Sequence, residues 1–227
     1  PRSSSAASDV YKRQGRAILL LSMMTYFLLF ATLIGGSQVA IDTTAGERER
    51  GSLEPLLTMP VSRASLVLGK IFATLAFMAV SLAIAIVSFS FAVKILPLAK
   101  IGMTANFSPA VCIQSYLVML PFAVLGASVM TFVASFSKTF KEAQTYTSLA
   151  MLAPTLPIIV VALKPVQASV PLMLVPSLSQ HLLVTGLVKA EGLDVAHALI
   201  SAIVTVACGC VFTAATVLRY RSEKLLI

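Results

Sequence analysis

The sequence predicts an all-α, polytopic integral membrane protein with about five transmembrane helices and a short amphipathic helix on the cytoplasmic side. Apolar residues make up 58% of the 227 residues and charged residues only 11%, whereas soluble domains contain about 25% charged residues. The apolar residues also form runs of about 20 residues, which is the length needed to cross roughly 30 Å of hydrocarbon. A soluble globular protein is excluded, because so few charges cannot cover the surface of a chain of this length.

The first 14 residues do not look like part of the natural protein. Residues 4–14 resemble a translated sequencing-library adapter, and they join an apolar run abruptly. We therefore interpret residues 1–14 as an artefact and exclude them from fold reasoning. On this interpretation, residues 15–227 are the membrane domain of a longer chain that has been truncated at its N-terminus. The alternative is a short polar tail.

Five segments satisfy the criterion for a spanning helix, and none contains Asp, Glu, Lys or Arg. They cover residues 17–41, 71–93, 111–136, 143–163 and 195–218. In the fourth segment, Pro154 and Pro157 each remove a backbone donor, so this helix is expected to kink or break near the middle of the membrane. The external stretch 164–194 contains two short apolar segments that we expect to dip into the outer leaflet. A pair of interfacial helices lying flat is the alternative.

Basic residues in the connections predict the orientation. Nine Lys and Arg residues lie on one side of the predicted membrane and four on the other, and cytoplasmic loops retain more of them. The connection 42–70 and the C-terminus are therefore expected in the cytoplasm, with the multi-pass chain in the inner (plasma) membrane. The net charge of +8 does not indicate a nucleic-acid partner, because the basic residues stand singly between apolar runs.

Motifs for catalysis and for metal or cofactor binding are missing from the sequence. Lys70 follows a glycine but lacks the rest of a phosphate loop, and there is no His-Glu-x-x-His motif. Cys208 and Cys210 lie roughly 200° apart around a helix, which is the wrong geometry for sharing a metal ion. The sequence therefore predicts no catalytic, cofactor-binding or metal-binding residue, and no enzymatic activity in this chain.

The cytoplasmic connection contains signals for two helix starts. Thr44 and Glu47 have the spacing of a capping box. Ser52 is expected to cap a second, short helix that ends before Pro60. Gly51 permits a sharp change of direction between the two helices.

The same connection has the composition of a protein-docking segment. Leu53, Leu56 and Leu57 occupy positions i, i+3 and i+4, which gives the short helix an apolar edge. The four charges before it alternate in sign, which suits a specific protein groove better than nucleic acid or anionic lipid. A solvated loop whose leucines rest on the membrane surface is the alternative. The predicted partner-coupling residues are Glu47, Arg48, Glu49, Arg50, Gly51, Ser52, Leu53, Glu54, Leu56 and Leu57.

These residues resemble a known family. The string Gly-Glu-Arg-Glu-Arg-Gly-Ser-Leu-Glu-Pro-Leu-Leu at 46–57, followed by Pro-Val-Ser-Arg at 60–63, looks like the coupling segment of type 2 ABC-transporter permeases, particularly the sodium-efflux group. The broken fourth span, the external hairpin and the tail 220–227 are similar as well. The resemblance implies a transmembrane domain that has no cofactor of its own and is moved by a separate ABC ATP-binding subunit, which holds ATP and Mg.

The resemblance also implies a second permease copy or a paralogue as partner, besides membrane lipid. It further implies an earlier transmembrane helix and an extracytoplasmic domain before the region seen here. Three other functions stay open. They are a permease that exports a drug, lipid or antibiotic instead of sodium, an integral-membrane enzyme whose catalytic part is missing, and an adaptor that recruits a cytosolic protein without transport. No predicted span contains a carboxylate, the usual marker of an ion pathway, so the cargo is not decided by the residues.

Overall fold

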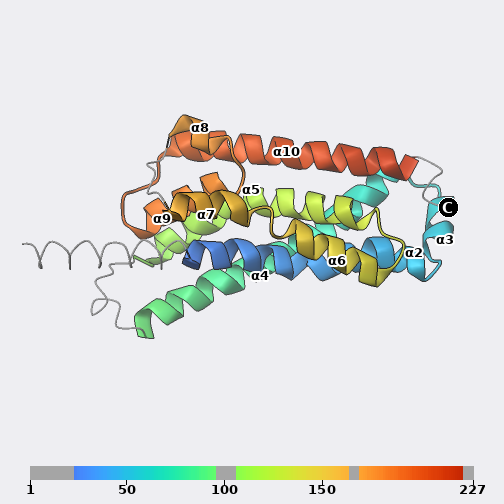
Figure 1. Ribbon diagram of the computed structural model, residues 1–227, viewed down its shortest axis with the longest axis horizontal. Helices are drawn as coiled ribbons and strands as arrows, with labels where there is room; N and C mark the ends of the chain where they lie inside the picture. The colour runs from blue at the N-terminus through green and yellow to red at the C-terminus, as the bar shows by residue number, and fades with distance from the viewer. Residues whose placement is uncertain (1–22, 96–105, 164–168, 222–227) are drawn as a thin grey trace, which may run out of the picture.

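A computed structural model of the chain describes residues 23–95, 106–163 and 169–221. In these ranges the chain forms an elongated bundle whose long helices follow a common direction (Figure 1), and no strand occurs in them, so the predicted all-α class is confirmed. The four helices in the described ranges that are long and apolar enough to cross a membrane are Met23–Glu49, Arg63–Ile95, Pro109–Ala134 and Val195–Arg221. The interpretation of residues 1–14 as an artefact concerns residues outside the described ranges and stays a prediction.

The first described helix is longer than predicted, because it continues past residue 41. It passes through a π-helical turn, η1 (Asp42–Gly46), into α2 (Glu47–Glu49). The predicted capping box at Thr44 is therefore wrong: the Thr44 hydroxyl donates back to the Ala40 carbonyl inside the helix. With no helix starting at this point, there are no free backbone N–H groups for Thr44 to cap.

The predicted short helix is present as α3 (Leu53–Thr58). Gly51 has φ +69°, a conformation that favours glycine, so the predicted change of direction at this residue is confirmed. The predicted capping role of Ser52 is wrong, because its hydroxyl donates to the Glu47 carbonyl at 3.1 Å and makes no cap hydrogen bond. The chain then enters α4 (Arg63–Ile95).

The helix at the centre of the bundle is α5 (Pro109–Ala134), which packs against α4, α10 and two shorter helices. Small residues let the neighbouring helices approach closely. A Cβ added at Gly36 of the first helix would lie 2.5 Å from Met78 Cγ of α4, and one added at Gly126 of α5 would lie 2.7 Å from Leu33 Cδ2. Close approach at small residues is the usual way in which membrane helices gain packing contacts.

The predicted fourth span is divided into two helices, which confirms the break expected from its prolines. α6 (Phe140–Ala150) and α7 (Thr155–Leu163) are separated by a turn that ends at Pro154. With 11 and 9 residues, each is too short to cross the hydrocarbon by itself. The described residues therefore contain four candidate spanning helices where the hydropathy pattern predicted five.

The external stretch forms α8 (Val170–Met173) and α9 (Leu178–Val188), and α10 (Val195–Arg221) follows. The amide of the buried Gln180 in α9 donates to the Ser201 hydroxyl at 3.1 Å and to the Thr205 hydroxyl at 2.9 Å. Thr205 lies ten residues into α10, or about 15 Å along it. These two bonds fasten the start of α9 to α10, while α9 packs mainly against α5. The choice between a segment that dips into the membrane and one that lies flat stays a prediction.

Candidate functional site

The predicted coupling residues lie at one end of the bundle, where α2 and α3 are close to the last turns of α10 (Figure 1). Two of the charged side chains, Glu47 and Arg48, are half-buried, whereas Glu49 and Arg50 are exposed. All four make polar contacts within the chain.

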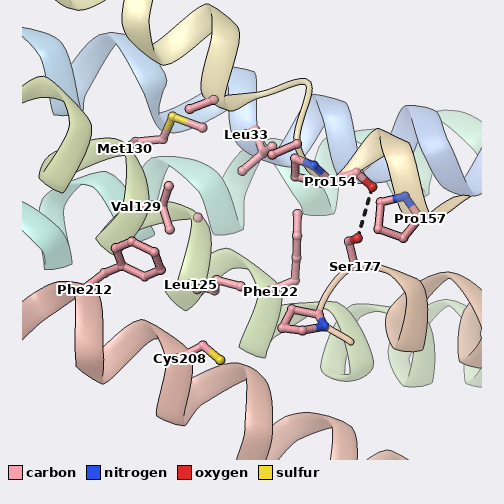
Figure 2. A pocket seen from close by; sticks show the side chains of 14 residues that line it. Leu33, Phe122, Leu125, Val129, Met130, Pro154, Pro157, Ser177, Cys208 and Phe212 are labelled. Carbon is pink, nitrogen blue, oxygen red and sulfur yellow. Dashed lines mark hydrogen bonds between the residues drawn. The ribbon is translucent and has the colours of Figure 1, made fainter. Parts of the chain in front are cut away.

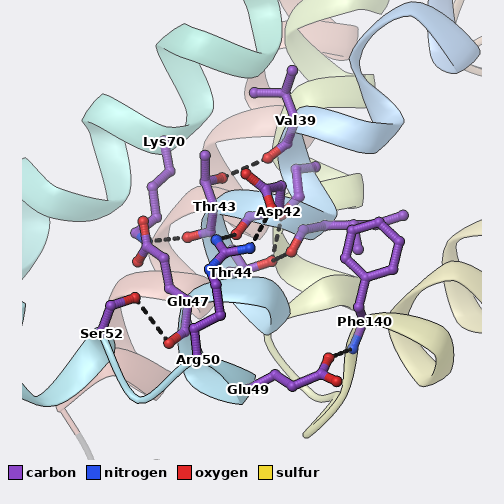
Figure 3. A network of polar contacts seen from close by, with 12 residues as sticks. Val39, Asp42, Thr43, Thr44, Glu47, Glu49, Arg50, Ser52, Lys70 and Phe140 are labelled. Atoms are coloured by element: carbon purple, nitrogen blue, oxygen red, sulfur yellow. Dashed lines mark hydrogen bonds and ion pairs between the residues drawn. The ribbon is translucent and has the colours of Figure 1, made fainter.

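The most buried of these contacts joins the first helix to α4. Lys70 of α4 is only 6% exposed, and its ammonium group contacts both the Glu47 carboxylate and the Thr43 carbonyl (Figure 3). The buried ring of Tyr220, at the end of α10, lies with its centroid 6.0 Å from the same ammonium group. We call Glu47, Lys70 and the Thr43 carbonyl the lysine clamp. It holds the end of the first helix against α4 and places the positive charge beside α10.

Two further charges bind the turn between α5 and α6. Arg48 donates to the Ser137 carbonyl at 3.4 Å. Glu49 accepts a hydrogen bond from the backbone N–H of Phe140, the first residue of α6, at 2.5 Å (Figure 3). A carboxylate at a helix N-terminus is favourable, because free N–H groups point toward it and the helix dipole is positive there.

The fourth charged residue, Arg50, pairs with a residue of the same segment. The Arg50 guanidinium donates to the Asp42 carboxylate at 2.8 Å, with both side chains 56% exposed. The hydrogen bond to Asp42 and the charge of that carboxylate raise the pKa of Arg50 above its ordinary value. An ion pair this exposed contributes little to stability but holds the loop in register across η1.

The leucine edge of α3 does not face outward as a whole. Leu53 is only 3% exposed and belongs to the core of this chain, while Leu56 is half-buried. The side chains of Glu54 and Leu57 lie outside what the structure describes. Leu53 thus fastens α3 to the membrane domain, so it is not available as an anchor for a partner.

The exposed apolar side chains at this end follow α3. Met59 is 53% exposed and Val61 is 42% exposed, and they flank Pro60 in the connection to α4. Sequence reasoning included Val61 in the resemblance at 60–63, but it did not identify Met59 and Val61 as exposed apolar residues. The signal in the sequence was weak: two apolar residues flank Pro60, and single apolar residues are common on protein surfaces.

A second connection at this end was also missed. The Arg219 guanidinium of α10 donates to the Ser135 carbonyl at 3.0 Å and stacks 3.8 Å from the centroid of the Phe136 ring. It ties the end of α10 to the end of α5. In the sequence, Arg219 was visible only as one of several basic residues that indicate orientation.

Among the described residues, no group of three or more His, Cys, Asp or Glu side chains is placed to hold a metal ion. The fold and this end of the bundle define a multi-pass α-helical membrane protein with a short helix clamped to one end. Residues 6–218 match the family described as ABC-2 family transporter protein, and the chain belongs to this family. The resemblance to type 2 ABC permeases is thereby confirmed.

The chain is also similar to a curated relative, the ABC transporter permease protein NatB of Bacillus subtilis (strain 168). The two are 30% identical over 183 residues, which cover 76% of this chain and 46% of NatB. The chain therefore spans about half the length of this relative. No solved structure matches the chain.

Proposed function

We propose that this chain is the membrane-spanning permease subunit of an ATP-driven ABC exporter, and that a separate ATP-binding subunit docks at the α3 end of the bundle. Family membership supports transport, and the relative whose name contains the word permease supports the role of a membrane subunit. The observation that carries the proposal is the combination of a short helix fixed rigidly to the bundle and exposed apolar residues directly after it. Met59 and Val61 supply the contact surface.

The fixed contacts give such a partner a mechanical route into the membrane domain. A displacement of α3 reaches α4 through the lysine clamp and reaches α6 through the hydrogen bond between Glu49 and Phe140. Because Leu53 is buried in the core, α3 cannot slide freely along the surface. In this proposal the chain performs no bond chemistry, and ATP with its Mg belongs to the partner.

A second permease copy or a paralogue completes the pathway in this proposal. The spanning helices α4 and α10 bury only 28% and 17% of their most apolar windows within the chain. Their outward faces carry large apolar side chains such as Phe72, Ile84 and Ile203. Faces of this kind suit either lipid or another membrane helix. In the proposed orientation, the α3 end and the C-terminus lie in the cytoplasm and the protein lies in the inner (plasma) membrane.

For the cargo, the resemblance in residues 46–63 supports sodium efflux as the first candidate. A specific observation favours a second candidate, an apolar drug or lipid, because the middle of the bundle contains an apolar hollow. Growth separates the two. Expression together with the cognate ATP-binding subunit raises tolerance to sodium chloride in the first case and tolerance to hydrophobic drugs in the second.

Docking is tested by charge substitution on the exposed apolar residues. Met59→Asp and Val61→Asp are expected to abolish copurification with the ATP-binding subunit and export, because an apolar contact becomes an unpaired charge. Leu56→Asp is expected to act in the same direction. Gln144→Asp, at an exposed position of α6, adds the same charge away from α3 and serves as the matched control. Normal copurification and export by the Met59 and Val61 variants, at normal expression, would contradict the docking surface.

A further inference from the structure

A hollow of about 310 Å³ lies in the middle of the bundle, beside the break between α6 and α7 (Figure 2). Its walls come from the first helix, α5, the α6–α7 turn, the turn before α9, and α10. Cys208 on the wall is the midpoint of α10, about 20 Å from either end of that helix. The hollow is therefore at the depth of the hydrocarbon layer when the bundle spans a membrane.

Small side chains and the broken helix create the space. Where a continuous fourth span would place helical side chains, the wall is formed by Ala150, Ala153 and the rings of Pro154 and Pro157. Gly126 of α5 forms part of the opposite wall without a side chain. The larger residues, among them Leu125 and Phe212, surround this space without filling it (Figure 2).

The hydroxyl that lines the hollow is already paired. Ser177 provides the one hydroxyl among the described lining residues, and this hydroxyl donates to the Pro154 carbonyl at 3.0 Å (Figure 2). The Ser177 backbone N–H donates to Gln180 Oε1 at 2.8 Å. These two bonds hold Ser177 at φ +71°, a conformation that costs a non-glycine residue free energy. An ordered water needs two to four polar partners, so this apolar space suits hydrocarbon better than water.

The hollow opens sideways, between the α6–α7 break and α10. Ala153 is exposed, and Leu125, Val129 and Phe212 are half-buried. The surface next to the opening continues with the exposed Leu152. At this depth the surrounding medium consists of acyl chains. The volume is about twice that of a 150 Å³ apolar cavity that takes up benzene, which leaves room for part of an alkyl chain.

We propose that this hollow is a binding site for an acyl chain that enters from the bilayer. The bound chain fills the gap between the α6–α7 break and α10 and contacts both of them. Its occupancy therefore restrains any relative movement of these two elements. The site lies within a single chain and does not depend on docking of an ATP-binding subunit.

Photo-crosslinking tests the site with two probes, a fatty acid and a phosphatidylcholine that each carry a diazirine on the acyl chain. The purified chain is reconstituted in phosphatidylcholine vesicles without any ATPase, so the result is separable from that of the docking test. The expected cross-links map to Leu125, Val129 and Phe212 in excess over the outward-facing Ile203. The two probes distinguish a free fatty acid from a phospholipid as the source of the chain.

A matched pair of substitutions on α10 provides the decisive comparison. Cys208→Phe fills the hollow, while Cys210→Phe places the same ring on the exposed side of the helix. We expect at least a tenfold loss of cross-linking at Val129 for Cys208→Phe and no loss for Cys210→Phe. Equal cross-linking in both variants, or no excess over Ile203, overturns the proposal.

A second measurement applies if Cys208→Phe does not fold. In the variant with Cys112→Ala and Cys210→Ala, Cys208 is the single thiol, and its reaction with N-ethylmaleimide is followed with and without added oleate. Oleate is expected to slow the reaction severalfold, because the acyl chain covers the thiol. A rate that does not change with oleate, in a chain that elutes as a folded species, counts against the site.

Discussion

The lysine clamp provides the sharpest test of how the α3 end is held. Glu47→Gln removes the negative charge from a pair in which Lys70 is 6% exposed and Glu47 is 23% exposed. The ammonium group then keeps three neutral partners: the Thr43 carbonyl, the amide of the new side chain and the ring of Tyr220. Removal of one partner from a buried ion pair costs about 3–5 kcal/mol of stability.

The expected loss for Glu47→Gln is somewhat smaller, because Glu47 is in contact with water. We expect the free energy of unfolding to fall by about 2–4 kcal/mol. Lys70→Met in the same chain removes the orphaned charge and replaces it with an apolar side chain of similar length. The double variant is therefore expected to recover to within about 1 kcal/mol of the parent protein.

The assay is reversible unfolding in mixed micelles with increasing sodium dodecyl sulfate, followed by circular dichroism. Asp42→Asn is the matched control, since it removes a carboxylate from a pair that is 56% exposed on both sides; its loss is expected to be below about 1 kcal/mol. If Glu47→Gln costs no more than Asp42→Asn, or if the double variant is as unstable as the single one, the clamp is not a desolvated ion pair.

Three other perturbations follow from the structure. Gln180→Leu removes two bonds from α9 to α10 and should lower the free energy of unfolding by about 1–3 kcal/mol in the same micelle assay; an unchanged value would show that these bonds do not hold α9. Gly36→Val forces a side chain into α4 and should cost about 1–3 kcal/mol or prevent folding, whereas Gly69→Val, with nothing within 4 Å of its added Cβ, is the control for helix propensity. In a cysteine-free background, Ser52→Cys is expected to be shielded from an impermeant thiol reagent in intact cells and Ala190→Cys to be labelled; the reverse pattern would overturn the proposed orientation.

The membrane helices could be predicted because a spanning helix depends on a local property, the hydrophobicity of about 20 consecutive residues. The extension of the first helix through η1 and α2 could not be predicted in this way. Its residues are polar, and they remain helical through contacts with partners distant in sequence, such as Lys70 and Phe140. A capping pattern at Thr44 and Glu47 was visible, but tertiary contacts decided against it.

The sequence predicted which residues make up the candidate site, but not which way their side chains face. The spacing of Leu53 and Leu56 correctly indicated an amphipathic helix. Periodicity cannot tell whether the apolar edge faces the protein's own core or a partner, and here Leu53 faces the core. For the same reason, the alternating charges suggested a partner's groove although the structure pairs them within the chain. The role of these residues toward a partner stays a prediction.

The π-helical turn η1 determines where the residues after it point. A π-helical turn holds one residue more than an α-helical turn, and one residue corresponds to about 100° of rotation around the axis. Regular α-helical winding of the same residues, without the π-helical turn, would swing Glu47 by about that angle, away from Lys70. The extra residue in η1 thus sets the rotation of everything that follows it. It directs the Glu47 carboxylate toward Lys70, and α3 with it, which a regular helix of this sequence would not do.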